Sequence, residues 1–207
     1  NSYMSILKTN YDFAIIGNGI LGSTLAWKLS EELPKTKIIL IGPKDRFGSA
    51  SIASGAMINV FAELEKDFLK SKPLVEKFKM GYESLQLWKN HHKELEKLSK
   101  SKIEINWGTH VINSSSMTEF EDETFNYIKN FLTDKKYVKK NKPIGPKRIV
   151  GLKTQYWSRT VKALEIEDGI IRSDQVINSI DKIILKKKNI LIEDTFLEKF
   201  IVNKNDN

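Results

Sequence analysis

The chain has 207 residues, 40% of them hydrophobic, a formal net charge of +8 and no cysteine; this composition is normal for a globular protein and excludes disulfides, thiolate zinc sites and cysteine nucleophiles. The positive charge does not indicate nucleic-acid binding, because only four of the 34 basic residues are arginines and the lysines are spread along the whole chain. No apolar run approaches the roughly 18 residues of a membrane span, and residues 1–10 lack the pattern of a signal peptide, so we expect a cytoplasmic protein without a membrane span.

The first predicted elements are a strand, a glycine-rich turn, a helix and a second strand. Tyr11–Ile16 is a compact apolar run, which is typical of a fully buried parallel strand. Gly17–Gly22 (GNGILG) follows at once, a helix is expected over Ile20–Leu33, and Lys37–Ile41 is a second buried strand. The apolar residues on one face of the helix are Leu21, Leu25, Ala26 and Leu29. This order predicts a βαβ crossover in a mainly parallel sheet.

Each glycine of the turn has a physical task in a dinucleotide-binding motif. Gly17 allows a sharp reversal out of the strand, and Gly19 leaves room for a pyrophosphate to approach the backbone. Gly22 lets the helix pack closely on the strands, while the helix N-terminus offers N–H groups to the phosphates. The alternative is an ordinary α/β turn that happens to be rich in glycine.

The end of the second strand departs from the motif. An Asp or Glu is expected there for the ribose hydroxyls, and this chain has Gly42. Asp45 is close enough in sequence to substitute, and Lys44 or Arg46 could instead meet a phosphate. The departure concerns the adenosine contacts and leaves the pyrophosphate contacts as predicted.

The rest of the chain alternates between helical and strand-like patterns. In chain order we first expect a small-residue loop at Gly48–Gly55, a helix from about Pro73 to Lys100 and a strand over Ile103–Ile112. A helix over Met117–Leu132, a loop at Asn141–Pro146 and partly extended chain over Tyr156–Ile166 follow. The last expected elements are a helix over Ser173–Ile183 opened by a serine N-cap, an exposed turn at Lys186–Lys188 and a strand over Asn189–Glu193. These patterns add a second, α+β region to the βαβ unit.

Three segments carry a resemblance to a known family. Phe47–Phe61 (FGSASIASGAMINVF) resembles the small-residue segment after the second strand in the amino-acid-oxidase-like FAD-dependent oxidoreductases, the group of D-amino-acid oxidase, glycine oxidase and sarcosine oxidase. Arg159–Ile180 is similar to the stretch in which a strand of that family ends in an acidic-Gly turn before a short helix, and Asn189–Asp194 to a strand that returns to the dinucleotide-binding sheet. The resemblance covers roughly residues 11–200 and implies that the dinucleotide is FAD.

The motif and the resemblance together name the expected cofactor contacts. The turn and strand end provide Gly17, Gly19, Ile20, Leu21, Gly22 and Gly42, and the small-residue segment provides Ser49, Ala50, Ser51, Ser54, Gly55, Ala56 and Met57. No catalytic acid or base can be named. No metal site is expected, since the neighbouring His91 and His92 diverge by about 100° on a helix. His110 is interpreted as a structural histidine, and Arg159 binds either a substrate carboxylate or a salt-bridge partner.

The expected organisation is an FAD-binding βαβ unit with its flavin-side loop at 11–70, a helical and mixed-sheet substrate region at 71–172, and a truncated return to the FAD-binding domain at 173–207. The resemblance implies oxidation of a small-molecule amine or amino acid by hydride transfer to the flavin. Since the family's fold continues beyond this point, the chain resembles a fragment or one part of a split enzyme, completed by a missing segment or a carboxy-terminal partner. The alternatives are a non-catalytic FAD- or nucleotide-binding module that needs a partner chain, and an NAD(P)-dependent dehydrogenase with Arg46 near a 2′-phosphate.

Overall fold

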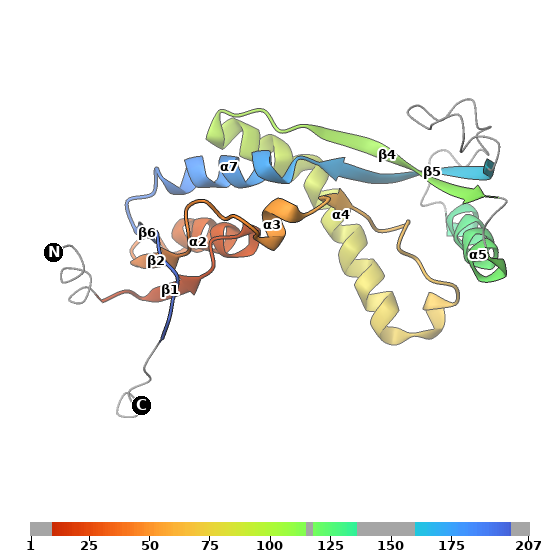
Figure 1. Cartoon of the computed structure of the whole chain (residues 1–207), viewed down its shortest axis with the longest axis horizontal. Coiled ribbons are helices and arrows are strands. Elements are labelled where there is room, and N and C mark those ends of the chain that lie inside the picture. Colours follow the sequence, from red (N-terminus) through yellow and green to blue (C-terminus); the bar gives the residue numbers. More distant parts are fainter. Residues whose placement is uncertain (1–9, 115–117, 136–159, 200–207) are drawn as a thin grey trace. The chain divides into compact units, whose positions relative to one another are not determined.

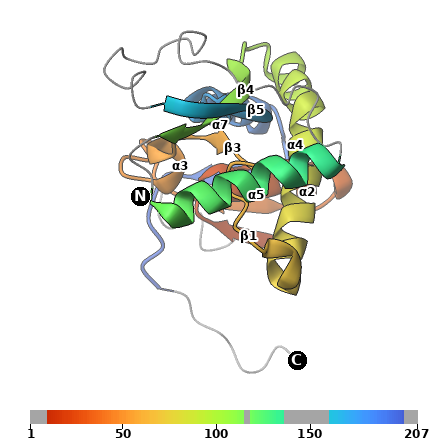
Figure 2. The same ribbon diagram turned by 90° about the vertical axis from the view of Figure 1, so that its right-hand side faces the viewer.

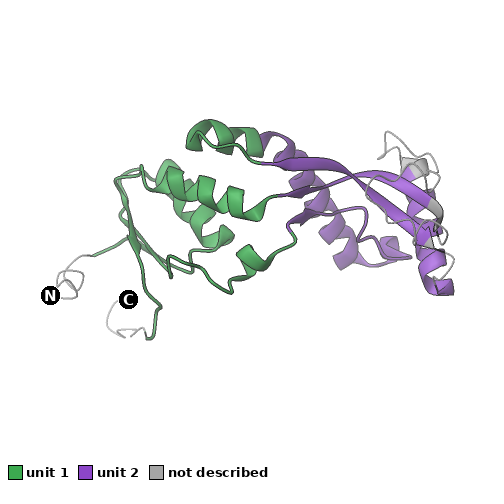
Figure 3. Cartoon of the chain, turned by 45° about the horizontal axis from the view of Figure 1, so that its top comes forward, with its two compact units in different colours: residues 1–55, 92–103, 172–207 green, residues 56–91, 104–171 purple. Residues whose placement is uncertain are grey.

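The computed structural model describes residues 10–114, 118–135 and 160–199, and the chain divides into two compact units. Unit 1 comprises residues 1–55, 92–103 and 172–207, and unit 2 comprises residues 56–91 and 104–171 (Figure 3). The predicted fold class is confirmed, because one sheet is parallel and Rossmann-like and the other is antiparallel. The three segment bounds expected from the sequence remain predictions.

Unit 1 is built around the parallel sheet. Its elements are β1 (Phe13–Ile16), α2 (Ile20–Glu32), β2 (Ile38–Ile41), α3 (Ala50–Ala53), the last turns of α4 (Lys72–Ser99), α7 (Ser173–Ile184) and β6 (Ile190–Glu193) (Figure 1). The strand order is β1-β2-β6, and Ile41 is in register with both Ile16 and Glu193. All three strands therefore end at the same level, and their carboxyl ends form one edge of the sheet.

Burial separates the two strands of the βαβ unit. Residues 38–40 of the central strand β2 are buried, as predicted for a parallel strand between two neighbours. Within β1 only Ile15 is buried, whereas Ile16 is 59% exposed and Phe13 is 38% exposed. The prediction of a fully buried first strand is wrong for the described residues, because β1 is an edge strand that pairs with β2 alone.

Helix α2 has the predicted position but packs through a different face. Its buried residues are Ser23, Ala26, Trp27 and Ser30. Leu21 is 84% exposed and Leu25 is 50% exposed, so the leucine face does not cover the sheet. The buried face includes the fully buried Trp27; of the predicted apolar face, Ala26 lies on it and Leu29 is half-buried.

Helix α7 is the most regular amphipathic element of unit 1. Its buried side chains lie on one face and include Val176, Ile177 and Ile180, and the helix packs against α2. The predicted serine N-cap is wrong. Arg172 is the N-cap and makes no side-chain capping bond, because a guanidinium has no acceptor for the helix N–H groups. It instead donates to the Asp174 carboxylate at 2.8 and 3.0 Å.

Unit 2 contains an antiparallel sheet and the helices that cover it. Its elements are β3 (Met57–Ile58), the 3-10 helix η1 (Phe68–Lys70), α4 up to His91, β4 (Ile105–Ser114), α5 (Glu119–Lys135) and β5 (Thr160–Ile171). The strand order is β3-β5-β4, and β4 and β5 lie side by side in both Figure 1 and Figure 2. Gly108, with φ +101°, lies where the register between these two strands shifts.

The core of unit 2 is rich in aromatic rings. Phe61 and Phe68 are fully buried beside Phe78 and Phe131, and the ring centroids of Phe68 and Phe131 are 5.0 Å apart in an edge-to-face arrangement. Such pairs add to the stabilisation from apolar burial alone. The helical spacing of Phe78 and its neighbours in the sequence is thus explained by core packing.

The predicted acidic-Gly turn is wrong. Asp168 and Gly169 lie inside β5, which continues to Ile171. A β-carbon on Gly169 would lie 2.7 Å from the Trp107 ring, so glycine serves close packing between strands rather than a turn. The expected loop Asn141–Pro146, the beginning of the extended segment at 156–159 and the candidate Arg159 lie outside the described residues. Among the helices that the structure describes, none is long and apolar enough to cross a membrane.

Candidate nucleotide-binding site

The Gly17–Gly22 turn has the backbone geometry that its glycines predict. Gly17 has φ +98°, a value that side chains rarely allow, and the chain reverses there out of β1. A β-carbon on Gly22 would lie 1.8 Å from the carbonyl oxygen of Gly17 and 3.3 Å from Cγ2 of Ile15. Gly22 therefore lets α2 lie directly against the strand that precedes it.

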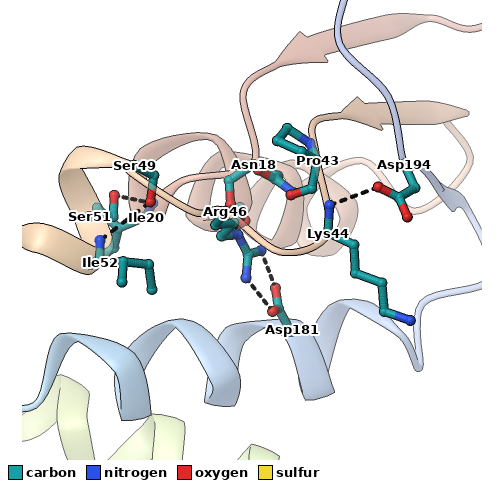
Figure 4. Close-up of polar contacts among 11 residues, drawn as sticks. Asn18, Ile20, Pro43, Lys44, Arg46, Ser49, Ser51, Ile52, Asp181 and Asp194 are labelled. Atoms are coloured by element: carbon teal, nitrogen blue, oxygen red, sulfur yellow. Dashed lines mark hydrogen bonds and ion pairs between the residues drawn. The ribbon is translucent and has the colours of Figure 1, made fainter.

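The N-terminus of α2 faces this turn. Gly19 is its N-cap in an extended conformation and makes no side-chain capping bond, and the first turn contains no acidic residue. The first N–H groups of an α-helix have no acceptor within the helix and carry a partial positive charge. Ser51 Oγ accepts the Ile20 N–H at 3.0 Å, which brings the small-residue segment onto the helix end (Figure 4). This arrangement can bind an anion.

The small-residue segment differs from the predicted loop. Residues 50–53 form the short helix α3, and Ser49 is its N-cap with Oγ accepting the Ile52 N–H. Ser51, inside α3, thus points to α2 with its orientation fixed by a helix. Ser54 and Gly55 complete the segment in unit 1, whereas Ala56 and Met57 belong to unit 2, where Met57 is in register with Ile170 of β5.

A buried arginine links the turn to helix α7, which lies far along the chain. Arg46 Nε donates to the Asn18 carbonyl at 2.7 Å, and its two terminal nitrogens donate to the Asp181 carboxylate at 2.6 and 2.7 Å (Figure 4). The Asn18 carbonyl also accepts the Ser23 hydroxyl at 2.8 Å. Arg46 is only 8% exposed and has φ +48°, so the surrounding contacts hold it in an unfavourable backbone conformation.

The sequence alone did not predict these contacts of Arg46. Asn18 lies between two motif glycines and Arg46 is one of only four arginines, and both facts are weak signals. Nothing in the sequence connects Arg46 with Asp181, which is 135 residues away. The arginine was considered as a phosphate ligand, and the structure instead uses all three of its nitrogens within the protein.

A cavity of about 330 Å³ opens beside the turn at the carboxyl ends of β2 and β6. Its lining residues are Asn18, Leu40, Gly42, Lys44, Arg46, Asp181, Leu185, Ile192 and Asp194. Ligands of open parallel sheets bind at this edge of the strands. Both the cavity and the α2 N-terminus belong to unit 1, so one unit holds the whole of this candidate site.

Gly42 is required sterically at the position where an acidic residue was expected. A β-carbon there would lie 2.5 Å from Cγ and Oδ1 of Asn18 and 2.8 Å from its backbone nitrogen. Asn18 Nδ2 donates to the Pro43 carbonyl at 2.9 Å, which holds the amide in that space (Figure 4). No side chain can be accommodated at residue 42 without moving the turn itself.

The possible substitutes for the missing carboxylate lie in different surroundings. Asp45 is exposed, accepts the Phe47 N–H at 3.3 Å and does not line the cavity. Lys44 does line it, and its backbone N–H donates to Oδ1 of Asp194 at 2.8 Å. Asp194, which the sequence analysis did not consider as a site residue, directly follows β6.

Unit 2 contains a buried carboxyl group whose pKa is raised. Asp168 is fully buried, and burial raises the pKa of its carboxyl above the ordinary value, although backbone bonds from Ala62 and Phe61 oppose that rise. The Ala62 N–H donates to Oδ2 at 2.8 Å and the Phe61 N–H at 3.0 Å. Asp168 therefore ties the chain after β3 to β5, and this is a structural role.

The other residues considered from the sequence do not gather into a second site. His110 is half-buried on β4 in register with Glu165, and the ring of His91 lies edge-on to Trp88. Across the described ranges, no group of three or more metal-ligating side chains is found.

Comparison with known proteins was made by family model, by sequence and by structure. The model of a family described as FAD dependent oxidoreductase matches residues 12–195. A search of curated proteins gives no significant sequence match.

Solved structures match this chain over much of its length. Glycine oxidase from Bacillus cereus matches with a TM-score of 0.70 and 18% identity, and the match covers 95% of this chain and 49% of that protein. Glycine oxidase from Geobacillus kaustophilus matches with a TM-score of 0.68 and 17% identity, and the match covers 89% of this chain and 46% of that protein. The FAD-bound L-alpha-glycerophosphate oxidase from Mycoplasma pneumoniae matches with 0.62 and 18% over 88% and 44%. At such identities the likeness shows the fold, and this chain spans about half the length of each of these proteins.

Proposed function

Because the chain belongs to the family of FAD dependent oxidoreductases, we propose that it binds FAD and serves the oxidation of an amine or amino acid. The observation that carries this proposal is the α2 N-terminus beside the cavity at the ends of β2 and β6, both in unit 1. When bound, the flavin would supply the redox chemistry by accepting a hydride. The residues of the chain would bind and orient the cofactor.

The pyrophosphate half of FAD fits the turn in chemical terms. Leu21 and Gly22 place backbone N–H groups in the first turn of α2, where a negative charge is stabilised by the helix dipole. The Ser51 hydroxyl, which already bonds the Ile20 N–H, is a further donor for a phosphate oxygen. Gly19 has φ −66°, so glycine is not needed there for its backbone angle, and we assign its role to free space.

The adenosine half fits the cavity of unit 1. Leu40, Leu185 and Ile192 give it apolar walls suited to a purine ring, and polar residues complete its lining. Arg46 is unsuited to the 2′-phosphate of NADP, because its nitrogens are bound to Asp181 and Asn18. The structure thus supports FAD over the alternative of an NADP-dependent dehydrogenase.

The flavin-side contacts are part of the same proposal. Ser49, Ala50, Ser54, Gly55, Ala56 and Met57 are the residues that we assign to them from the family resemblance. Ala56 has φ +47°, and its carbonyl accepts the Ile171 N–H at 3.0 Å, so its conformation is held by β5. No catalytic acid or base is assigned. Amine oxidation is supported by the glycine oxidases, yet the glycerophosphate oxidase shares the fold, and the fold alone does not select a substrate.

We further propose that polypeptide outside these 207 residues completes the site, as a continuation of the chain or as a partner. The matched oxidases are about twice as long. The outer edge of β1 has no neighbouring strand among the described residues, and Phe13 and Ile16 are exposed along that strand. Unpaired apolar edges favour association with another strand. The alternative function, a non-catalytic FAD-binding module that acts with a partner chain, is supported by the same observations. The cytoplasmic location remains a prediction.

Cofactor binding is tested by titrating the purified chain with FAD and recording flavin absorbance and fluorescence. Gly19→Val should abolish binding while leaving the circular dichroism spectrum unchanged, because a β-carbon there already lies 3.0 Å from Ser51 Oγ and the larger group would occupy the phosphate position. Gly81→Ala, on α4 in unit 2, is the matched control, since its β-carbon would meet Val60 at ordinary contact distance, 3.5 Å. Equal FAD affinity in wild type and Gly19→Val would overturn the assignment of the site.

Catalytic competence is tested by oxygen consumption or dye reduction on the FAD-loaded chain, with a panel of amino acids, N-methyl amino acids and glycerol phosphate. We expect no steady turnover by residues 1–207 alone. Turnover of an amine without added polypeptide would show that a complete active site lies in this chain and would refute the need for a partner. Turnover of glycerol phosphate alone would refute the amine proposal.

A further inference from the structure

Strands β2 and β6 end at the same level, and the residue that follows β6 can replace the ribose carboxylate missing after β2. Ile41 and Glu193 are in register, and the Gly42 N–H donates to the Glu193 carbonyl at 3.0 Å. The next residue of the neighbouring strand is Asp194, so it follows β6 at the level at which Gly42 follows β2. Figure 4 shows its carboxylate beside the loop that begins at Pro43.

Asp194 is held in place and still available to a ligand. Its Oδ1 accepts the Lys44 N–H at 2.8 Å, which joins the end of β6 to the loop after β2. Its side chain lines the 330 Å³ cavity and is exposed to solvent. A carboxylate has about four lone-pair sites, and the Lys44 N–H uses one of them.

The other charged side chains that line the cavity are either paired with each other or unable to accept a hydrogen bond from a hydroxyl. Arg46 and Asp181 neutralise each other in a two-pronged ion pair. Lys44 carries an ammonium group, which cannot accept a hydrogen bond from a hydroxyl. Among the cavity's lining residues, Asp194 is therefore the carboxylate outside an ion pair, in a site whose walls include Leu40 and Ile192.

We infer that Asp194 binds the ribose hydroxyls of the adenosine half, in the role that an acidic residue at the end of β2 fulfils in the dinucleotide-binding motif. This inference rests on the proposed function, because it assumes that the cavity receives the adenosine of a dinucleotide. The acid follows β6 rather than β2 for a steric reason, because the Asn18 amide fills the space that a side chain at Gly42 would need. A carboxylate at this point also disfavours a 2′-phosphate.

The test uses the full chain with FAD, ADP and 2′-deoxy-ADP as probes, and calorimetric titration gives each Kd. Wild type should bind ADP about ten-fold more tightly than 2′-deoxy-ADP, the effect of one charge-assisted hydrogen bond. In Asp194→Asn the Kd for ADP should rise about ten-fold, with little change for 2′-deoxy-ADP. An asparagine keeps an acceptor for the Lys44 N–H, so the loop should stay in place.

Asp45→Asn is the matched control, because Asp45 is an exposed acid of the same loop outside the cavity lining. The Kd values of Asp45→Asn should equal those of wild type. Weaker ADP binding by Asp45→Asn, together with unchanged binding by Asp194→Asn, would assign the ribose to Asp45 and overturn the inference. Equal wild-type affinity for ADP and 2′-deoxy-ADP would also overturn it, and that measurement needs no variant to fold. FAD binding unaffected by Asp194→Asn removes this inference alone. Binding of ADP through Asp194 without FAD binding removes the flavin proposal alone, and binding of neither nucleotide removes both.

Discussion

The partly buried pair of Arg46 and Asp181 is expected to hold the Gly17–Gly22 turn in its shape. The perturbation is Asp181→Asn, which keeps the size of the side chain and removes its charge. The guanidinium, 8% exposed, loses two charge-assisted bonds of 2.6 and 2.7 Å, while its bond to the Asn18 carbonyl remains. The amide offers an NH₂ where a carboxylate oxygen stood, so one guanidinium N–H then faces a donor.

Removing one partner of a fully buried ion pair costs about 3–5 kcal/mol. The Asp181 side chain is 30% exposed, so water can reach the guanidinium and lower that cost. We therefore expect Asp181→Asn to lower the free energy of unfolding by about 2 kcal/mol, a roughly thirty-fold change in the folding equilibrium.

The matched control lies on the same helix. Arg172 and Asp174 form the same two-pronged contact, at 2.8 and 3.0 Å, but their side chains are 55% and 45% exposed. Exposed pairs contribute about 0.2–1 kcal/mol, so Asp174→Asn should have a much smaller effect.

The assay is equilibrium urea unfolding followed by far-UV circular dichroism, with amide hydrogen exchange to localise the change. Asp181→Asn should speed exchange in α7 and in residues 17–23, which the Arg46 side chain joins. Equal losses in Asp181→Asn and Asp174→Asn, or unchanged exchange in the turn, would refute the reasoning that burial gives this pair its weight.

Three further changes test the packing of the turn and the buried carboxyl. Gly22→Ala should cost about 3 kcal/mol or prevent folding of unit 1, because the added methyl group would lie 1.8 Å from the Gly17 oxygen. Gly42→Glu should weaken FAD binding rather than restore a ribose contact, since its β-carbon would displace Asn18; FAD titration measures this. Burial raises the pKa of the Asp168 carboxyl, so the protonated form favours folding and ionisation opposes it. The stability that the protonated carboxyl contributes is therefore lost as pH rises from the ordinary pKa of about 4 through the raised value. Asp168→Asn should remove that loss, so its thermal midpoint should improve relative to wild type between pH 4 and pH 7.5.

Each of these changes has a control or a contradicting result. Gly55→Ala, whose β-carbon would meet nothing within 4 Å, should leave unfolding unchanged, and a cost equal to that of Gly22→Ala would contradict the steric argument. Tighter FAD binding in Gly42→Glu would show that the turn can move. Parallel pH profiles for wild type and Asp168→Asn would show that the buried carboxyl does not govern the pH dependence.

Much of the local structure follows from short-range patterns in the sequence. The βαβ order, the long helix α4 and the strands β2 and β6 were predicted to within a few residues, because apolar periodicity and glycine or proline boundaries act over one or two turns of chain. The tasks of Gly17 and Gly22 were also predicted, since a positive φ and a close helix–strand approach are properties of the motif itself. These features depend on neighbours in sequence, and a single chain reveals them.

The faces that become buried were predicted less well. Leu21 and Leu25 of α2 stay exposed while Ser23 and Trp27 pack inward, and Ile16 stays exposed although its strand is apolar. Periodicity places residues on faces but does not say which face has a partner. That depends on the strand order, which puts β1 at the edge of the described sheet.

Most of the candidate site was decided by tertiary structure. The sequence by itself predicted a dinucleotide-binding turn at Gly17–Gly22 and showed that Gly42 stands where an acid is usual. Only the folded chain brings Asp181 to Arg46 and Asp194 to Lys44, across 135 and 150 residues. The physical reason is that a hydrogen bond requires proximity in space. For Asp194 that proximity comes from the pairing of β6 with β2, and for Asp181 from the packing of α7 against α2, which no local pattern in these elements encodes.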